Sequence, residues 1–285
     1  MTPTADRRLF CFGLGYTARR LAARLAAQGW GIAGTARRPA AAATPDGWPL
    51  YRFDRGHPLD PAALAGATHV LVSVPPDEAG DPVIDAHGGD LAAPGTIEWI
   101  GYLSTTGVYG DRGGGWVSED DAPAPQTERA RRRLAAEAAW RALRPPAHVF
   151  RLAGIYGPGR SAIDTLRAGT ARRIVKPGHA VSRIHVEDIA AVLAASIARP
   201  RPGAVYNVCD DAPAPPAEVI GHAAALLGLP APPEEPFDPA TLSPMSASFF
   251  AENRRVSNDL IKRELGIVLR YPTYRDGLAA LLAEP

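Results

Sequence analysis

The sequence lacks several features that would assign a protein to a class at once. Only two of its 285 residues are cysteines, Cys11 and Cys209, and each lies in or just after an apolar run. We therefore expect buried thiols in a reducing compartment and no disulfide framework. No stretch of 18 apolar residues occurs, and the polar start leads into an apolar run too short for a signal peptide. These absences predict a cytoplasmic protein without a membrane partner.

An excess of one charge is missing as well. The 31 basic and 30 acidic residues give a net charge of +1, which supplies no field to attract nucleic acid or anionic lipid. The basic run at 129–133 lies in a helical pattern and is most simply a solvated face. The seven histidines show no metal-ligand spacing with acidic or cysteine partners. We expect a small-molecule substrate, no metal, no nucleic acid, and a monomer or a homodimer.

What the sequence does have is a regular alternation of apolar, strand-length segments and helical patterns. With 46% hydrophobic residues, a chain of this length can bury a full core. The predicted strands cover residues 9–12, 30–35, 50–53, 70–74, 97–105, 148–152 and 205–208. Strands that are apolar on both faces and alternate with helices belong in a parallel sheet covered on both sides. The pattern predicts an α/β protein with a doubly wound parallel sheet, the Rossmann fold.

The alternation weakens after about residue 212, where proline-rich connections surround a single helical pattern. We expect a Rossmann domain in residues 1–157, completed by residues 182–212. Residues 158–181 and 213–285 are expected to form a smaller region that binds the substrate.

A glycine-rich turn follows the first predicted strand. Gly13, Gly15 and Ala18 form the pattern GxGxxA between that strand and an amphipathic helix. Small residues allow a tight turn and a close approach of pyrophosphate, while the helix N-terminus presents N–H groups to the anion. In this strand–turn–helix context the pattern predicts a dinucleotide site; the alternative is a merely structural turn.

The end of the second strand indicates which dinucleotide is bound. Sites for NAD typically carry an acidic residue about 20 positions after the turn, and residues 30–38, WGIAGTARR, contain none. Thr35, Arg37 and Arg38 stand there instead, and a guanidinium can bind a 2′-phosphate through paired hydrogen bonds. We predict a preference for NADP over NAD; the alternative is a solvated strand end. Asp54, after the third strand, is expected to contact adenine or to cap a loop.

Four later motifs carry a family resemblance. They are LSTTGVYGD at 103–111, FRLAGIYGPGR at 150–160, SRIHVEDIA at 182–190 and VYNVCDD at 205–211. Together with the glycine turn, in this order and spacing, they resemble the extended short-chain dehydrogenase/reductase superfamily, which includes nucleotide-sugar epimerases and dehydratases. The segments at 73–83 and 253–278 resemble more narrowly its atypical YeeZ-like group. Tyr16, Ser73 and Pro75 complete the candidate cofactor-binding residues.

The resemblance also implies catalytic residues, of which one essential member is absent. In the family, a Ser or Thr three positions before the Val of the VYG motif polarises the substrate oxygen, and Thr105 takes that position. The alternative is that Thr105 and Thr106 are only β-branched residues that end a strand. The family's proton carrier is a Tyr followed four residues later by a Lys. Here Arg129 stands at the Tyr position and Arg133 at the Lys position. A guanidinium stays protonated, so it cannot serve as the acid and base.

The sequence leaves the replacement for that tyrosine open. Other polar groups are candidates for the proton carrier: Tyr109, Tyr156, Asp111 and Glu119. Alternatively, Arg129 and Arg133 bind an anionic substrate, or they form with Glu137 a solvated face of the helix. Two functions follow. The protein is an NADP(H)-dependent oxidoreductase or epimerase-like enzyme acting on a small or nucleotide-linked substrate, or it is a non-catalytic NADP(H)-binding sensor or scaffold.

Overall fold

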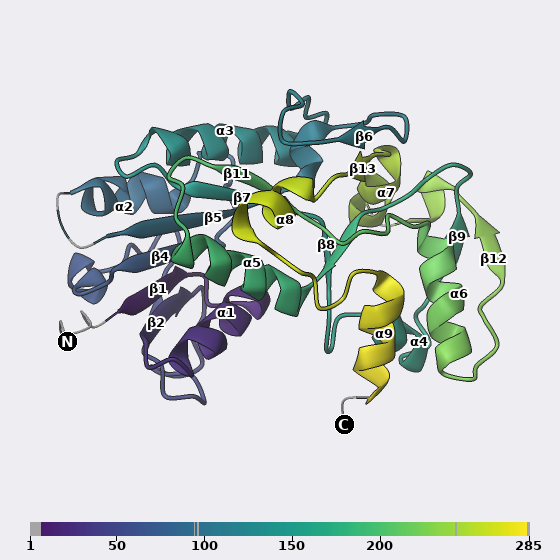
Figure 1. The fold of residues 1–285 in the computed structure, drawn as a ribbon, viewed down its shortest axis with the longest axis horizontal. Coiled ribbons are helices and arrows are strands. Elements are labelled where there is room, and N and C mark those ends of the chain that lie inside the picture. The colour runs from purple at the N-terminus through teal and green to yellow at the C-terminus, as the bar shows by residue number, and fades with distance from the viewer. Residues whose placement is uncertain (1–6, 94, 96, 243, 284–285) are drawn as a thin grey trace. The chain divides into compact units, whose positions relative to one another are not determined.

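The computed structural model describes residues 7–93, 95, 97–242 and 244–283. Its main feature is a seven-stranded parallel sheet (Figure 1). In spatial order the strands are β11 (Val205–Val208), β7 (His148–Leu152), β5 (Trp99–Thr105), β4 (His69–Val72), β1 (Arg8–Phe12), β2 (Gly31–Ala36) and β3 (Leu50–Arg52). Each strand predicted from the sequence is present in this sheet, so the prediction of an α/β fold with a doubly wound parallel sheet is confirmed.

The strand order places the glycine turn at a point where the sheet reverses its direction of winding. Strand β1 lies between β2 and β4, and Cys11 is level with Gly34 on one side and Leu71 on the other. In open parallel sheets, ligands bind beyond the carboxyl ends of the strands at such a point. The turn after β1 and the loops after β2 and β4 are therefore the segments placed to form a site.

Helices cover both faces of the sheet (Figure 1). On one face, Val83 of α2 (Pro82–Ala92) and Trp140 of α3 (Glu128–Ala142) join a buried cluster with Phe12 and Tyr102 from the strands. Helices α1 (Tyr16–Ala26) and α5 (Val186–Ala198) lie on the other face. Burial of these aromatic and aliphatic side chains fixes each helix against its strands.

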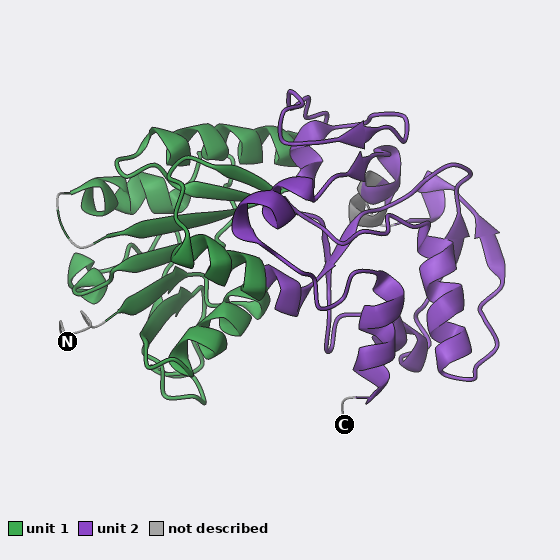
Figure 2. Ribbon diagram, in the orientation of Figure 1, with its two compact units in different colours: residues 1–105, 128–151, 190–206 green, residues 106–127, 152–189, 207–285 purple. Residues whose placement is uncertain are grey.

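The chain divides into two compact units (Figure 2). Unit 1 comprises residues 1–105, 128–151 and 190–206, and unit 2 comprises residues 106–127, 152–189 and 207–285. Besides the sheet and its helices, unit 1 holds the short 3₁₀ helix η1 (Pro61–Leu64). The domain boundaries predicted from the sequence remain a prediction.

Unit 2 is built from short elements. Its helices are η2 (Thr106–Tyr109), α4 (Ala162–Arg167), α6 (Pro216–Leu226), η3 (Pro239–Thr241), α7 (Pro244–Ala251), α8 (Asp259–Leu265) and α9 (Tyr274–Ala283). Its two-stranded parallel pairs are β8 (Gly154–Tyr156) with β10 (Arg183–His185), β9 (Arg173–Val175) with β12 (Glu234–Pro236), and β6 (Trp116–Val117) with β13 (Arg255–Val256). A buried cluster that includes Ile163, Ala223 and Leu278 joins α4, α6 and α9.

Two further observations concern the described part of the chain. No helix there combines the length and the apolar character that crossing a bilayer requires. Nor do the described residues bring together three His, Cys, Asp or Glu side chains in a position to hold a metal ion.

Candidate functional site

Hydrogen bonds from both neighbouring strands hold the glycine turn in place. The N–H of Gly13 donates to the hydroxyl of Thr35 on β2 at 2.9 Å. The hydroxyl of Ser73, just after β4, donates to the carbonyl of Gly13 at 2.6 Å. Both residues were predicted to bind the cofactor, and the structure shows them as supports of the turn. The turn is therefore hydrogen-bonded on one side to β2 and on the other to the residue that follows β4.

The two glycines of this turn are needed for different reasons. Gly13 has a φ of +85°, and a Cβ built there would lie 2.5 Å from the hydroxyl oxygen of Ser73. Gly15 has extended backbone angles, and a Cβ there would meet no atom within 4 Å. Gly15 precedes α1, whose N-terminus has no side-chain cap. An uncapped helix N-terminus beside open space fits the pyrophosphate of a dinucleotide, which binds to backbone N–H groups there.

The two arginines after β2 differ in environment from Thr35. Thr35 is only 1% exposed, whereas Arg37 and Arg38 are exposed to solvent. Neither arginine forms a hydrogen bond or an ion pair with any described residue. Their positive charges are therefore not neutralised within the described chain and are available to an anionic ligand.

Asp54 caps the loop that follows β3. Its carboxylate accepts hydrogen bonds from the N–H of Gly56 at 3.0 Å and pairs with Nδ1 of His57 at 2.8 Å. The hydrogen bond with His57 lowers the pKa of Asp54. Of the two roles expected for Asp54, the structure displays the loop cap.

A surface ion-pair cluster joins the loops after β3 and β4. Arg55 donates two hydrogen bonds to the carboxylate of Asp77, at 2.8 and 2.9 Å, and a third to Asp85 at 2.7 Å. Asp77 belongs to the loop that also holds Pro75, which is exposed. We call this cluster the Arg55 clamp. It fixes one loop against the other at the carboxyl edge of the sheet.

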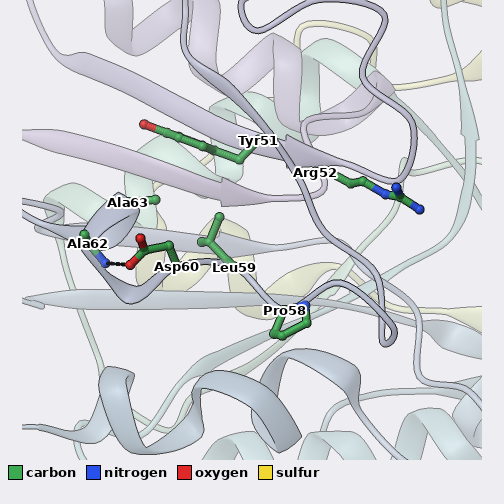
Figure 3. Close-up of a pocket in the computed structure, with 7 residues that line it drawn as sticks. All are labelled: Tyr51, Arg52, Pro58, Leu59, Asp60, Ala62 and Ala63. Atoms are coloured by element: carbon green, nitrogen blue, oxygen red, sulfur yellow. Dashed lines mark hydrogen bonds between the residues drawn. The ribbon is translucent and has the colours of Figure 1, made fainter.

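A hollow of about 420 Å³ lies beside the edge strand β3 (Figure 3). It is lined by Tyr51, Arg52, Pro58, Leu59, Asp60, Ala62 and Ala63. Asp60 accepts a hydrogen bond from the N–H of Ala62 and so caps η1. Figure 3 shows the Tyr51 hydroxyl and the Arg52 guanidinium pointing in opposite directions. With its polar groups dispersed or engaged, this hollow offers no converging set of ligands.

The predicted catalytic and anion-binding residues of unit 1 lie at the end of β5 and on α3. Thr105 is the last residue of β5 and is half-buried. Arg133 donates to the carbonyl of Leu103 on β5 at 2.6 Å, and its guanidinium lies 5.8 Å from the ring centre of Tyr102. Arg129 is exposed. Arg133 is thus bound to the sheet, which differs from the solvated face considered for this helix.

Glu137 requires the clearest correction. It is only 2% exposed and accepts hydrogen bonds from Ser104 at 2.5 Å and from Nη2 of Arg151 at 2.8 Å. The interpretation of Glu137 as part of a solvated face was therefore wrong. Arg151, inside a strand apolar on both sides, was the signal for this pair, because a buried charge needs a partner.

Two of the alternative proton carriers form one hydrogen-bonded group inside unit 2. Tyr109 is fully buried, and its hydroxyl donates to the side-chain carbonyl of Asn207 at 2.8 Å. The backbone N–H of Asn207 donates to Glu119 at 2.7 Å. Tyr109 and Glu119 are thus both bonded to Asn207 within unit 2.

The other two candidates also have partners in unit 2. Asp111 accepts a hydrogen bond from the backbone N–H of Asn253 at 2.7 Å, which lowers the pKa of Asp111. Tyr156 donates to the carbonyl of Thr273 at 3.4 Å, and burial raises the pKa of its phenol. A phenol whose pKa is raised is a poorer acid near neutral pH.

Comparison with known proteins places this geometry in context. No protein-family model matches the chain. A functionally unknown conserved protein from Silicibacter pomeroyi DSS is 54% identical, with a TM-score of 0.91, over 98% of this chain and 99% of that one. The present chain belongs to the same family. Among curated proteins, Protein YeeZ of Escherichia coli K12 is a distant homologue, 28% identical over 78% of this chain and 85% of YeeZ.

A second curated match is partial. The 3-diazoavenalumate denitrifying reductase of a Streptomyces species is 32% identical over 141 residues. The alignment covers 46% of this chain and 45% of the reductase, so this chain aligns with less than half of the length of that relative.

Several solved structures share the fold and hold a nicotinamide cofactor. Human epimerase family protein SDR39U1 with NADPH matches over 98% of this chain and 100% of that one, with 18% identity and a TM-score of 0.74. The dTDP-glucose 4,6-dehydratase of Bacillus anthracis with NAD matches over 97% and 96%, with 15% identity and a TM-score of 0.76. The structural neighbours are proteins of the NAD-dependent epimerase/dehydratase family, and at these identities they confirm the resemblance read from the motifs at the level of the fold.

Proposed function

We propose that this protein binds NADP(H) and acts as an oxidoreductase or epimerase-like enzyme on a small or nucleotide-linked substrate. The observation that carries the proposal is the hydrogen-bonded Gly13 turn, which leads into a helix N-terminus without a side-chain cap. Two arginines, Arg37 and Arg38, follow β2 and form no ion pair among the residues that the structure describes. The cofactor-bound neighbours support a nicotinamide dinucleotide, and the arginines support the phosphorylated form.

Each part of the cofactor has a group suited to hold it. The N–H groups at the start of α1 bind the pyrophosphate, and Gly15 leaves room for it. Ala18 is buried, and its small side chain allows α1 to pack closely on the sheet. Arg37 and Arg38 bind the 2′-phosphate through charge-assisted hydrogen bonds. A bound nicotinamide supplies hydride transfer to or from the substrate carbon.

Thr105 is the group proposed to orient the reacting oxygen. A threonine hydroxyl of ordinary acidity cannot exchange protons by itself, but it can donate a hydrogen bond to a carbonyl or an alcoholate. The neighbouring Ser104 points to the other face of β5 and donates to Glu137, so it does not share this role.

We expect the two glycines to respond differently to alanine. Gly13→Ala should lower the free energy of unfolding by about 1–3 kcal/mol, because it forces a positive φ on alanine and a contact with Ser73. Gly15→Ala should cost less than about 1 kcal/mol of stability. It should nevertheless weaken NADPH binding by about tenfold or more, because its methyl group obstructs the charge-assisted bonds to the pyrophosphate. Chemical denaturation and calorimetric titration measure the two effects.

The matched control is Gly89→Ala, at a helical position where a Cβ meets no atom within 4 Å. That variant should bind NADPH like the wild type. Unchanged NADPH affinity in a folded Gly15→Ala protein would contradict the pyrophosphate site.

Thr105→Val is expected to lower the turnover number by about 10²- to 10³-fold, the usual cost of one hydrogen-bond donor to a developing oxyanion. The assay is oxidation of NADPH in the presence of a panel of aldehydes, ketones and nucleotide sugars. Thr105→Ser, which keeps the hydroxyl, should retain most of the activity. Equal rates for Val and Ser variants on an accepted substrate would remove Thr105 from the mechanism.

A second candidate function is a non-catalytic NADP(H)-binding sensor or scaffold. It is favoured by the arginine at the family's tyrosine position and by the hydrogen bonds that engage the alternative proton carriers. Tight NADPH binding without turnover across the whole panel would support this second function.

A further inference from the structure

Unit 2 contains a cavity of about 840 Å³, and none of its lining residues is assigned to the cofactor. Its walls come from the segment 156–174, from α6 and α9, from single residues of β10 and α7, and from Leu242. Apolar and aromatic side chains include Tyr156, Val219, Phe250 and Tyr274. A cavity of this size holds one small molecule, since ligand pockets commonly measure about 300–1,000 Å³.

The guanidinium of Arg183 lines this cavity with part of its hydrogen-bonding capacity unused. Its Nη1 donates to the carbonyls of Val181 at 2.8 Å and Ala214 at 2.9 Å, which fixes the position of the group. Its Nε and Nη2 have no hydrogen-bond partner among the described residues. Nε–H and Nη2–H lie on one edge of the planar guanidinium, the edge that binds both oxygens of a carboxylate or phosphate.

The charges around Arg183 leave this cation incompletely neutralised. Burial lowers the pKa of Arg183, which means that the charged group has lost much of its hydration. Two carboxyl groups raise the pKa of Arg183, Asp210 and, less strongly, Glu218. Asp210 forms no hydrogen bond with the guanidinium, and burial raises the pKa of Asp210 to about 7. A carboxyl group with this pKa is only partly ionised at neutral pH. Glu218 is already bonded to Tyr274 and Arg275, each at 2.6 Å. A ligand oxyanion would supply the missing charge.

Another arginine of the same cavity is already paired. Arg172 donates to Glu235 at 2.6 and 3.0 Å and to the carbonyl of Thr241 at 2.9 Å. The acidic residue of the cavity wall, Asp164, accepts a hydrogen bond from Ser161 at 2.6 Å. Arg183 is thus distinguished from Arg172 by its two unused donors.

We propose that this cavity binds a small organic anion whose carboxylate or phosphate is held by Nε and Nη2 of Arg183 and whose unsaturated or aromatic body packs against Tyr156, Phe250 and Tyr274. The inference rests on the proposed function in one respect, because it names this anion as the substrate class of the enzyme. Binding itself depends only on residues of unit 2.

Calorimetric titration of the full chain without cofactor tests this proposal. The probes are trans-cinnamate, phenyl phosphate and the neutral analogue cinnamamide. The wild type should bind one or both anions, and it should bind cinnamamide at least tenfold more weakly. Arg183→Met should weaken anion binding by about tenfold or more, the cost of losing charge-assisted hydrogen bonds. Arg183→Lys, which keeps the charge without the paired donors, should fall between. Cinnamate and phenyl phosphate distinguish a carboxylate from a phosphate.

Two matched variants keep the test decisive if Arg183→Met fails to fold. Arg172→Met should bind the anion like the wild type, because Arg172 is already paired. Ile220→Trp should abolish binding by filling the cavity from α6 while Arg183 itself is kept. Equal affinity for cinnamate and cinnamamide, no binding of either anion to the wild type, or full binding by Ile220→Trp would overturn the proposal. NADPH is titrated separately. NADPH binding without anion binding would refute only the proposed anion site, and anion binding without NADPH binding would refute only the cofactor assignment.

Discussion

Replacing Arg37 with alanine is expected to weaken NADPH binding by about 10- to 100-fold, the range for hydrogen bonds to a charged group, and to leave NADH binding nearly unchanged. The reason is that the 2′-phosphate is the group that distinguishes the two cofactors. Arg37 directly follows β2, is exposed, and forms no ion pair among the described residues, so its removal leaves no internal charge unpaired. Titration of both cofactors into both proteins measures the change in preference.

The control for this experiment is Arg24→Ala. Arg24 is an exposed arginine in the last turn of α1, so the substitution removes the same charge away from the carboxyl edge of the sheet. It should leave both affinities within about twofold, because exposed charges farther than a Debye length of about 10 Å are largely screened. Arg38→Ala, measured alongside, shows whether Arg37 or Arg38 contributes more to binding of the 2′-phosphate. An unchanged NADPH-to-NADH ratio in both Arg37→Ala and Arg38→Ala would show that these residues do not select the cofactor.

The largest loss of stability is expected for Glu137→Ala. This change should lower the free energy of unfolding by about 3–5 kcal/mol, because it leaves the Arg151 guanidinium buried without its carboxylate. Arg151 is only 5% exposed and forms three hydrogen bonds with Glu137, so water cannot replace the lost partner. Equilibrium denaturation in urea measures the difference.

Two comparisons show whether burial of the pair causes this loss. Glu128→Ala removes an exposed carboxylate that pairs with Arg131 on the same helix, and it should change stability by no more than about 1 kcal/mol. The double variant Glu137→Met with Arg151→Met should recover much of the loss, because an apolar pair leaves no buried charge. A single variant Glu137→Ala as stable as Glu128→Ala would mean that the buried pair contributes little.

The sheet could be predicted from the sequence because its strands are apolar on both faces. Segments that are apolar on both faces fit best in a parallel sheet that helices cover on both sides. The glycine turn then identifies the first strand of that sheet. The role of Thr35 could not be predicted in the same way. Whether its hydroxyl meets a ligand or the N–H of Gly13 depends on the register of β2 against β1, which composition does not reveal.

The sequence indicated that Arg151 needs a partner, but it did not identify Glu137 as that partner, and it did not indicate the role of Arg183. Helix α3 carries alanines and arginines on most of its surface, so its pattern does not show which side faces the sheet. In the structure Glu137 turns inward to Arg151, while Arg133 reaches a strand carbonyl. The unused donors of Arg183 become apparent only once the two carbonyls that hold its Nη1 are known.

The Arg55 clamp has a consequence for the affinity of any ligand that binds at the carboxyl edge of the sheet. Loops that are free to move lose conformational entropy when a ligand orders them, and this loss reduces affinity. Arg55 already ties the loop after β3 to Asp77 and Asp85, so that entropy is surrendered when the chain folds. A ligand bound there would lose less of its binding free energy to the ordering of these loops.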